Sequence, residues 1–247
     1  MRIRTVGQGD FHGGKEVTAT PFAEGIQAIL FEPVGCLAEF PPEPFQEIAA
    51  RLFQRRKQPS KSGSRVYWRL LNSMEASFAS SIAAPAVEAL ELESVEAAML
   101  YEDARPALVE LRSMGVRALV VSSLCDAALR RFLDKCGLDE FFESVHSRDS
   151  SGGIKAAPLK AALAAANLIP RRTVFLTDTA AGLELARSLE VNPVLMMNDP
   201  DEAKRLALRN PAGGIVSLHE LCDMIRVVSA KRRLVETDAG ANVYKCT

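Results

Sequence analysis

Four polar residues of the 247-residue chain stand where they could act on an anionic group. Glu32, Ser122 and Asp178 each come shortly after an apolar run, and Lys155 opens a helical pattern. A carboxylate can serve as a nucleophile or bind a metal ion, whereas a hydroxyl and an ammonium can hold the oxygens of a phosphoryl group. Whether the four act together depends on the elements that carry them.

Short β-rich apolar runs alternate with helical patterns along most of the chain. The apolar runs are 27–31, 116–121, 142–146, 173–176, 193–197 and 214–216. The helical patterns between and after them are 105–114, 126–136, 156–166, 182–189 and 218–228. The first, second and fourth runs are continuously apolar, which is typical of strands buried on both faces of a parallel sheet. The alternation predicts a doubly wound α/β fold, in which ligands bind beyond the carboxyl ends of the strands.

One segment interrupts this alternation. No strand is convincing from Pro41 to about Leu100, and Phe45, Ile48 and Leu52 form an apolar helical stripe. Further helices are expected over 66–79 and 84–99, so the segment is predicted to be an all-helical cap. The predicted division is an N-terminal extension (1–25), an α/β core (26–40 and 101–228), a helical cap (41–100) and an extended or disordered C-terminal tail (229–247).

Composition excludes several classes of protein. The net charge is −1, which gives no overall field for nucleic acid. No run of about 18 apolar residues is present, so we expect no membrane span. The five cysteines are irregularly spaced without a CxxC pair, which suits reduced thiols and predicts a cytoplasmic location.

The order and placement of four segments resemble the haloacid dehalogenase-like (HAD) superfamily. The segments are 29–37, 121–123, 152–158 and 175–182, and the resemblance runs from about residue 27 to 228. It implies a Rossmann-like core, Mg²⁺ and hydrolysis of a small anionic substrate. It places Glu32 at the position of the nucleophile and metal ligand, and Val34 at the acid–base position, whose backbone carbonyl binds the metal. It places Ser122 and Lys155 at the phosphoryl contacts and Asp178 at the metal.

The chain departs from the family's motifs at several of these positions. The family's first motif is DxDGT or DxxGT, so Glu32 replaces the nucleophilic aspartate, Val34 the acid–base aspartate, and Cys36 the threonine. Gly182 stands where the fourth motif, often GDxxxD, has its second acid. The extra methylene of glutamate displaces the carboxylate, and a shift of about 1 Å can cost about 100-fold in rate. Loss of the acid–base group typically costs about 10²–10⁴-fold.

Each of these residues also has a structural interpretation. Glu32 could pair with Lys155, and Ser122 or Asp178 could cap the helix that follows it. The ordered set of four nevertheless favours a site that descends from a hydrolase.

Two functional hypotheses follow from the resemblance and its departures. In the first, the protein has an eroded, catalytically weak or inactive site with at most weak Mg²⁺ binding, and acts by binding or assembly. In the second, it is an active Mg²⁺-dependent phosphatase-like or dehalogenase-like hydrolase that uses Glu32 as its nucleophile.

A run of basic residues could serve the binding role. Seven basic residues and no acidic one lie between Ile48 and Met74. These are Arg51, Arg55, Arg56, Lys57, Lys61, Arg65 and Arg69. The run indicates either a positive patch for an anionic substrate or partner, or a solvated helix face with a flexible turn. A protein partner is one candidate, and a nucleic acid or another anionic surface is a third, less favoured hypothesis.

Overall fold

The computed structural model describes residues 22, 25–54, 56–57, 62–75 and 84–243, with side chains up to residue 230. Most of the predicted N-terminal extension, 1–25, lies outside the described residues. Within the described part, no helix is both long and apolar enough to cross a membrane.

A six-stranded parallel sheet forms the centre of the molecule. Its strand order is β5-β4-β1-β6-β7-β8. The strands are β1 (Ala28–Phe31), β4 (Arg117–Val121), β5 (Ser144–His146), β6 (Thr173–Thr177), β7 (Asn192–Met196) and β8 (Gly213–Ile215). All six predicted strands are confirmed, and β1, β4 and β6 are almost entirely buried, as their continuous apolar character predicted.

The register of the sheet brings the predicted site residues to one edge. Phe31, the last residue of β1, pairs with Val120 of β4 and with Leu176 of β6. Glu32 and the residues that follow β4 and β6 therefore leave the sheet at the same height. This is the carboxyl edge at which ligands bind in open α/β sheets.

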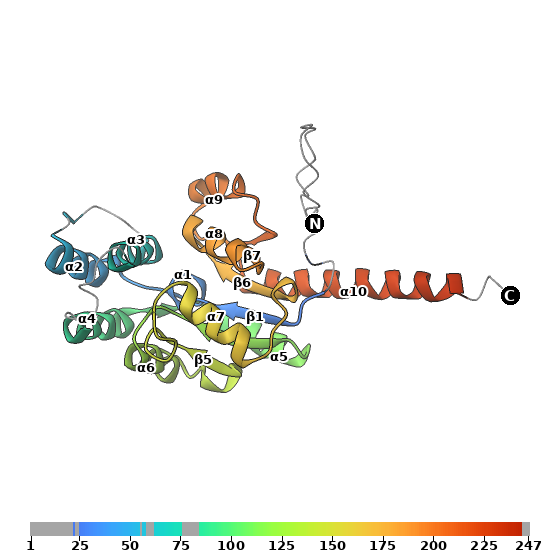
Figure 1. Cartoon of the computed structure of the whole chain (residues 1–247), viewed down its shortest axis with the longest axis horizontal. Helices are drawn as coiled ribbons and strands as arrows, with labels where there is room; N and C mark the ends of the chain where they lie inside the picture. The colour runs from blue at the N-terminus through green and yellow to red at the C-terminus, as the bar shows by residue number, and fades with distance from the viewer. Residues whose placement is uncertain (1–21, 23–24, 55, 58–61, 76–83, 244–247) are drawn as a thin grey trace.

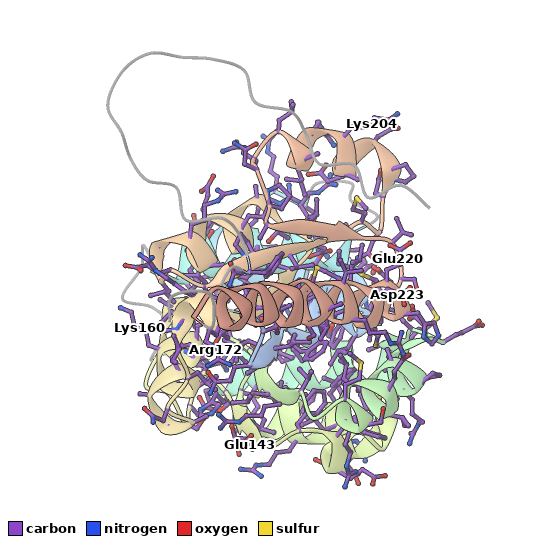
Figure 2. All side chains as sticks on the ribbon, turned by 90° about the vertical axis from the view of Figure 1, so that its right-hand side faces the viewer. Glu143, Lys160, Arg172, Lys204, Glu220 and Asp223 are labelled. Atoms are coloured by element: carbon purple, nitrogen blue, oxygen red, sulfur yellow. The ribbon has the colours of Figure 1, made fainter. Side chains whose placement is uncertain are left out.

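Helices cover the sheet and connect its strands. They are α5 (Ala104–Ser113), α6 (Asp126–Cys136), α7 (Ala156–Ala165), α8 (Ala180–Ser188), α9 (Pro200–Ala207) and α10 (Leu218–Val243). Figure 2 shows Glu143, beside edge strand β5, and Lys204, on α9 near the opposite edge, at opposite ends of the molecule. The α/β class with a Rossmann-like core is thus confirmed.

Residues 41–100 are called the helical insertion below, and their described part (41–54, 56–57, 62–75 and 84–100) contains three helices. These are α2 (Pro42–Phe53), α3 (Gly63–Glu75) and α4 (Ala84–Ala97). Strands β2 (Ala38–Glu39) and β3 (Met99–Leu100) pair antiparallel where the chain leaves and re-enters the core. The rings of Phe40, Phe45 and Tyr67 contact one another in series, and Phe40 also contacts Phe132 of α6. In Figure 1 the insertion lies beside the carboxyl end of the sheet.

Two helical expectations were wrong. Helix α10 does not end near Val228 but continues to Val243, and Figure 1 shows it projecting from the rest of the chain. No Gly or Pro stands between Val228 and Gly240 to stop it. Helix α9 was not predicted at all, because it is short and rich in charged residues, and only Leu206 of its eight residues is buried.

Candidate active site

Glu32 leaves the end of β1 and is buried, with 3% of the residue exposed. Its Oε1 accepts a hydrogen bond from the Ser122 hydroxyl at 2.7 Å and lies 3.5 Å from the Val34 backbone N–H. Burial raises the pKa of the carboxyl to about 8, against the lowering effect of these two bonds. Glu32 is therefore mostly protonated at neutral pH, which weakens it both as a nucleophile and as a metal ligand.

The turn after Glu32 is tightly packed. Gly35 has φ of +82°, and a Cβ added there would lie 2.5 Å from Oδ2 of Asp178, so only glycine fits both the conformation and the space. Val34 and Cys36 are fully buried. An apolar side chain at position 34 cannot transfer a proton, as the sequence indicated.

Asp178 follows β6 and receives hydrogen bonds from two sides. Its Oδ2 accepts from the Ser64 hydroxyl of α3 and from the Asn198 amide at 3.3 Å, while Asn198 also donates to the Gly35 carbonyl at 2.7 Å. Its Oδ1 is buried without a hydrogen-bond partner among the described residues. Burial raises the pKa of Asp178 to about 7.

The position of the second acid in the fourth motif is closed by packing. A Cβ added at Gly182 would lie 1.9 Å from Oγ1 of Thr177. Thr177 itself stands where that motif has its glycine. Compared with the family motif, position 177 thus has a larger side chain and position 182 a smaller one, and the Thr177 side chain occupies the space next to position 182.

The two predicted phosphoryl contacts are placed differently. Ser122 is bonded to Glu32, as above. The Lys155 ammonium donates to Oδ1 of Asn72 on α3 at 2.5 Å, and its backbone N–H donates to the Ser123 hydroxyl at 2.7 Å. The structure therefore brings Ser122 directly to Glu32, whereas the bond to Asn72 directs the head group of Lys155 toward the helical insertion.

Tyr67 of α3 is a site residue that the sequence did not indicate. It is fully buried, and its hydroxyl has no hydrogen-bond partner among the described residues. Burial and the nearby Glu32 and Glu91 carboxylates raise its pKa well above the usual value. Tyr67 of the helical insertion therefore lies close to Glu32. Ser64 and Asn198 were also missed, since nothing local distinguishes them from other polar residues.

A cleft of about 610 Å³ reaches Asp178 from the side of α9. Arg65 and Arg69 of α3 line one wall, and Thr179 at the start of α8 lines the other. The Arg65 guanidinium donates to Glu202 of α9 at 2.9 Å. Glu32 does not line this cleft, so the opening leads to the predicted metal side of the site.

The donor set is a poor fit for a tightly bound Mg²⁺. No group of three or more potential His, Cys, Asp or Glu ligands is found within the described residues. Burial favours the neutral forms of Glu32 and Asp178, and Ser64 and Asn198 already donate to Oδ2 of Asp178. Mg²⁺ prefers ionised oxygen ligands in near-octahedral geometry, and burial disfavours the ionised form of both carboxyls.

Comparison with known proteins bears on this site. A family model described as haloacid dehalogenase-like hydrolase matches residues 5–190. Tyrosine-protein kinase PtkA of Mycobacterium tuberculosis (strain H37Rv) is 31% identical over 99 residues, which are 39% of this chain and 34% of the kinase. The Mycobacterium bovis protein of that name matches equally. The chain thus spans about a third of the length of these curated relatives.

Solved structures with the same fold include hydrolases of different activity. A haloacid dehalogenase-like hydrolase from Streptococcus pneumoniae superposes with a TM-score of 0.61 at 17% identity, covering 81% of this chain and 98% of the other. A HAD phosphatase from Thermococcus onnurineus gives 0.56 at 20% identity, with coverage of 81% and 98%. L-2-haloacid dehalogenase from Xanthobacter autotrophicus gives 0.55 at 13% identity, with the same coverage, and that structure has chloropropionic acid covalently bound.

Proposed function

Since the chain belongs to the haloacid dehalogenase-like hydrolase family, we propose that it is a member whose hydrolytic site is closed and weakened, and that it acts mainly by binding. The observation that carries this proposal is the state of Glu32. The carboxyl at the nucleophile position is buried, bonded to Ser122, and has its pKa raised to about 8. A neutral carboxyl cannot attack a phosphorus or carbon centre.

The surroundings of Glu32 support the same conclusion. Val34 supplies no proton for a leaving group, and Thr177 fills the space where a further acid would stand. Two residues of the helical insertion, Ser64 and Tyr67, lie against Asp178 and near Glu32. The insertion thus covers the site with the protein's own side chains.

One observation favours the alternative of an active hydrolase. Oδ1 of Asp178 is buried without a partner among the described residues, and the cleft of about 610 Å³ ends at Asp178. A metal ion or a substrate entering by the cleft could engage that oxygen. Glu32 would then act as the nucleophile on a small phosphorylated or halogenated substrate, as in the phosphatases and the dehalogenase of the same fold.

Turnover of para-nitrophenyl phosphate with Mg²⁺ tests the proposal. We expect no hydrolysis above the rate of the Glu32→Gln variant, which keeps the shape of the side chain and removes its charge. We further expect Glu32→Asp combined with Val34→Asp to raise the rate, since it restores the missing groups. Turnover by the native protein well above that of Glu32→Gln would establish the alternative.

A groove between α2 and α3 is suited to the proposed binding role. It has a volume of about 240 Å³ and an apolar floor that includes Val66 and Leu70. Its three charged lining residues are all basic: Arg56, Lys57 and Arg69. We propose that an acidic segment of a partner protein binds here.

The partner proposal predicts a specific salt dependence. An acidic probe peptide of ten glutamates should bind less tightly as salt rises, and less tightly to Arg56→Gln/Lys57→Gln than to the control Lys204→Gln on α9. Equal binding by both variants would locate the acidic partner's surface elsewhere.

A further inference from the structure

Glu91 of α4 is a buried carboxylate held by groups of the core. Its side chain is 1% exposed, and Arg148, in the loop after β5, is 15% exposed. The two Arg148 terminal nitrogens donate to the two carboxylate oxygens at 2.7 and 3.1 Å. The Cys125 backbone N–H donates to one of these oxygens at 3.0 Å.

The groups around Glu91 form an anion-binding cradle that belongs entirely to the core. Cys125 is the N-cap residue of α6, an eleven-residue helix whose N-terminus carries partial positive charge. A bidentate guanidinium contact is the strongest form of charge-assisted hydrogen bonding to a planar oxyanion. The Arg148 guanidinium also donates to the Ser123 carbonyl at 3.1 Å, which fixes its orientation.

The carboxylate that fills this cradle comes from the helical insertion. Helix α2 packs against both α3 and α4, so the three helices form one body. Helix α4 also packs against α6 of the core, so an opening movement of that body would break this packing and carry Glu91 away with it. The two terminal nitrogens of Arg148 and the Cys125 N–H would remain behind as unpaired donors suited to an anion, while Nε of Arg148 would keep its ion pair with Asp149 at 3.5 Å.

We propose that the cradle of Arg148 and the Cys125 N–H is a binding site for a small oxyanion, a phosphate monoester or a carboxylate, and that Glu91 is its internal occupant when the insertion is closed. Binding of the external anion displaces Glu91 and stabilises the open insertion. Arg148 donates to the carbonyl of Ser123, whereas the preceding residue, Ser122, donates to Glu32, so the ligand would bind beside the position of Glu32 rather than at it.

The proposal is tested by replacing the internal anion with an external one. Glu91→Ala empties the cradle and should lower the melting temperature by on the order of 10 °C, because it leaves the terminal nitrogens of Arg148 and the Cys125 N–H without their acceptor. Inorganic phosphate at 100 mM should raise the melting temperature of this variant by several degrees more than chloride of the same ionic strength. The native protein should respond less, because Glu91 competes.

A second variant removes the cradle itself. Glu91→Ala/Arg148→Met should show no difference between phosphate and chloride, which separates this site from phosphate bound at Ser122 or Lys155. Glu91→Gln, which retains the shape of the side chain, replaces Glu91→Ala if the latter does not fold. An equal response of the single variant to phosphate and chloride would overturn the proposal. Because the readout is binding, the result is independent of whether the protein hydrolyses anything.

Discussion

Burial governs the chemistry of the two carboxyls that the sequence singled out. In the open sheet edge of a hydrolase, carboxylates that bind a cation are ionised. Here the pKa of Glu32 is raised to about 8 and that of Asp178 to about 7, mainly by loss of solvent. Glu32 and Asp178 keep the order and the strand-end placement of the family's acidic residues, but burial favours their protonated forms.

These raised pKa values predict that stability falls as pH rises. Between about pH 5 and pH 8 the folded protein keeps protons on Glu32 and Asp178 that the unfolded chain has lost. Each increase of one pH unit in this window therefore lowers the free energy of unfolding. We expect the free energy of unfolding to decline by on the order of a few kcal/mol across this window. Urea denaturation at a series of pH values measures it. Glu32→Gln and Asp178→Asn should each flatten the profile, and unchanged profiles would mean that these carboxyls are ionised at neutral pH.

Because the Thr177 side chain fills the space next to Gly182, substitutions at positions 177 and 182 should be energetically coupled. Gly182→Asp should destabilise the protein by about 1–3 kcal/mol, because its Cβ meets the Thr177 side chain. Thr177→Gly removes that obstacle, so the double variant should be more stable than the sum of the two single changes predicts. A thermodynamic cycle from urea denaturation gives the coupling. Strict additivity would show that the site can relax around both side chains.

At the scale of elements, α4 is joined to the core along its length. The Glu91–Arg148 pair lies near its middle, and the Arg131 side chain of α6 contacts Glu96 at 2.6 Å near its end. The Lys135 ammonium donates to the Val95 and Ala98 carbonyls at 2.8 and 3.2 Å. These carbonyls at the end of α4 have no hydrogen-bond donor within the helix, and a cation there is favourable because the C-terminus of a helix carries partial negative charge.

The bonds from Lys135 to the end of α4 give a prediction that separates a local effect on this helix from an effect on the whole fold. Lys135→Met should destabilise the protein by about 1–2 kcal/mol, since it removes charge-assisted bonds to the end of α4. Amide hydrogen exchange should accelerate in α4 more than in the sheet. Lys160→Met, on α7 (Figure 2), is the matched control and should leave exchange in α4 unchanged. Equal acceleration in both variants would show that the bonds from Lys135 do not hold the helix end.

The sequence predicted the elements well because their signals are local. Helix α6 begins at Asp126 and stops at Gly137, as its apolar spacing and terminal glycine indicated. Helix α9 had a signal that was overlooked: Asp199 before Pro200 is a typical N-cap followed by proline in the first turn, and its side chain does accept from the backbone of residues 201 and 202.

The sequence predicted only part of the site because the rest depends on tertiary packing. Glu32, Ser122 and Asp178 follow strands, so strand periodicity placed them. Tyr67 and Glu91 come from helices of the insertion, and their approach to the core is set by how α3 and α4 dock. No spacing within one helix can indicate that its residue fills a site formed by distant strands.

For the molecule as a whole, the proposed displacement of Glu91 requires that the helical insertion can open away from the core. Trp68, the single tryptophan of the chain, lies on α3 and is 5% exposed, so its fluorescence reports this closure. In the native protein we expect blue-shifted emission and weak quenching by acrylamide. Glu91→Ala should increase the quenching severalfold, because it removes the carboxylate that joins α4 to Arg148 and so weakens the contact between the insertion and the core.

Phosphate then distinguishes two forms of the open state. When phosphate occupies the cradle of the Glu91→Ala variant, it should stabilise the protein while the insertion stays open. The melting temperature should then rise, and acrylamide should still quench Trp68 strongly. A rise in melting temperature together with weaker quenching of Trp68 by acrylamide would mean that phosphate bridges the core and the insertion as Glu91 does. That result would contradict the proposal that the external anion displaces Glu91 and stabilises the open insertion. It would show instead that the oxyanion is a ligand that closes the insertion. Trp68→Phe, whose remaining signal comes from tyrosine alone, shows that the change in emission comes from this residue.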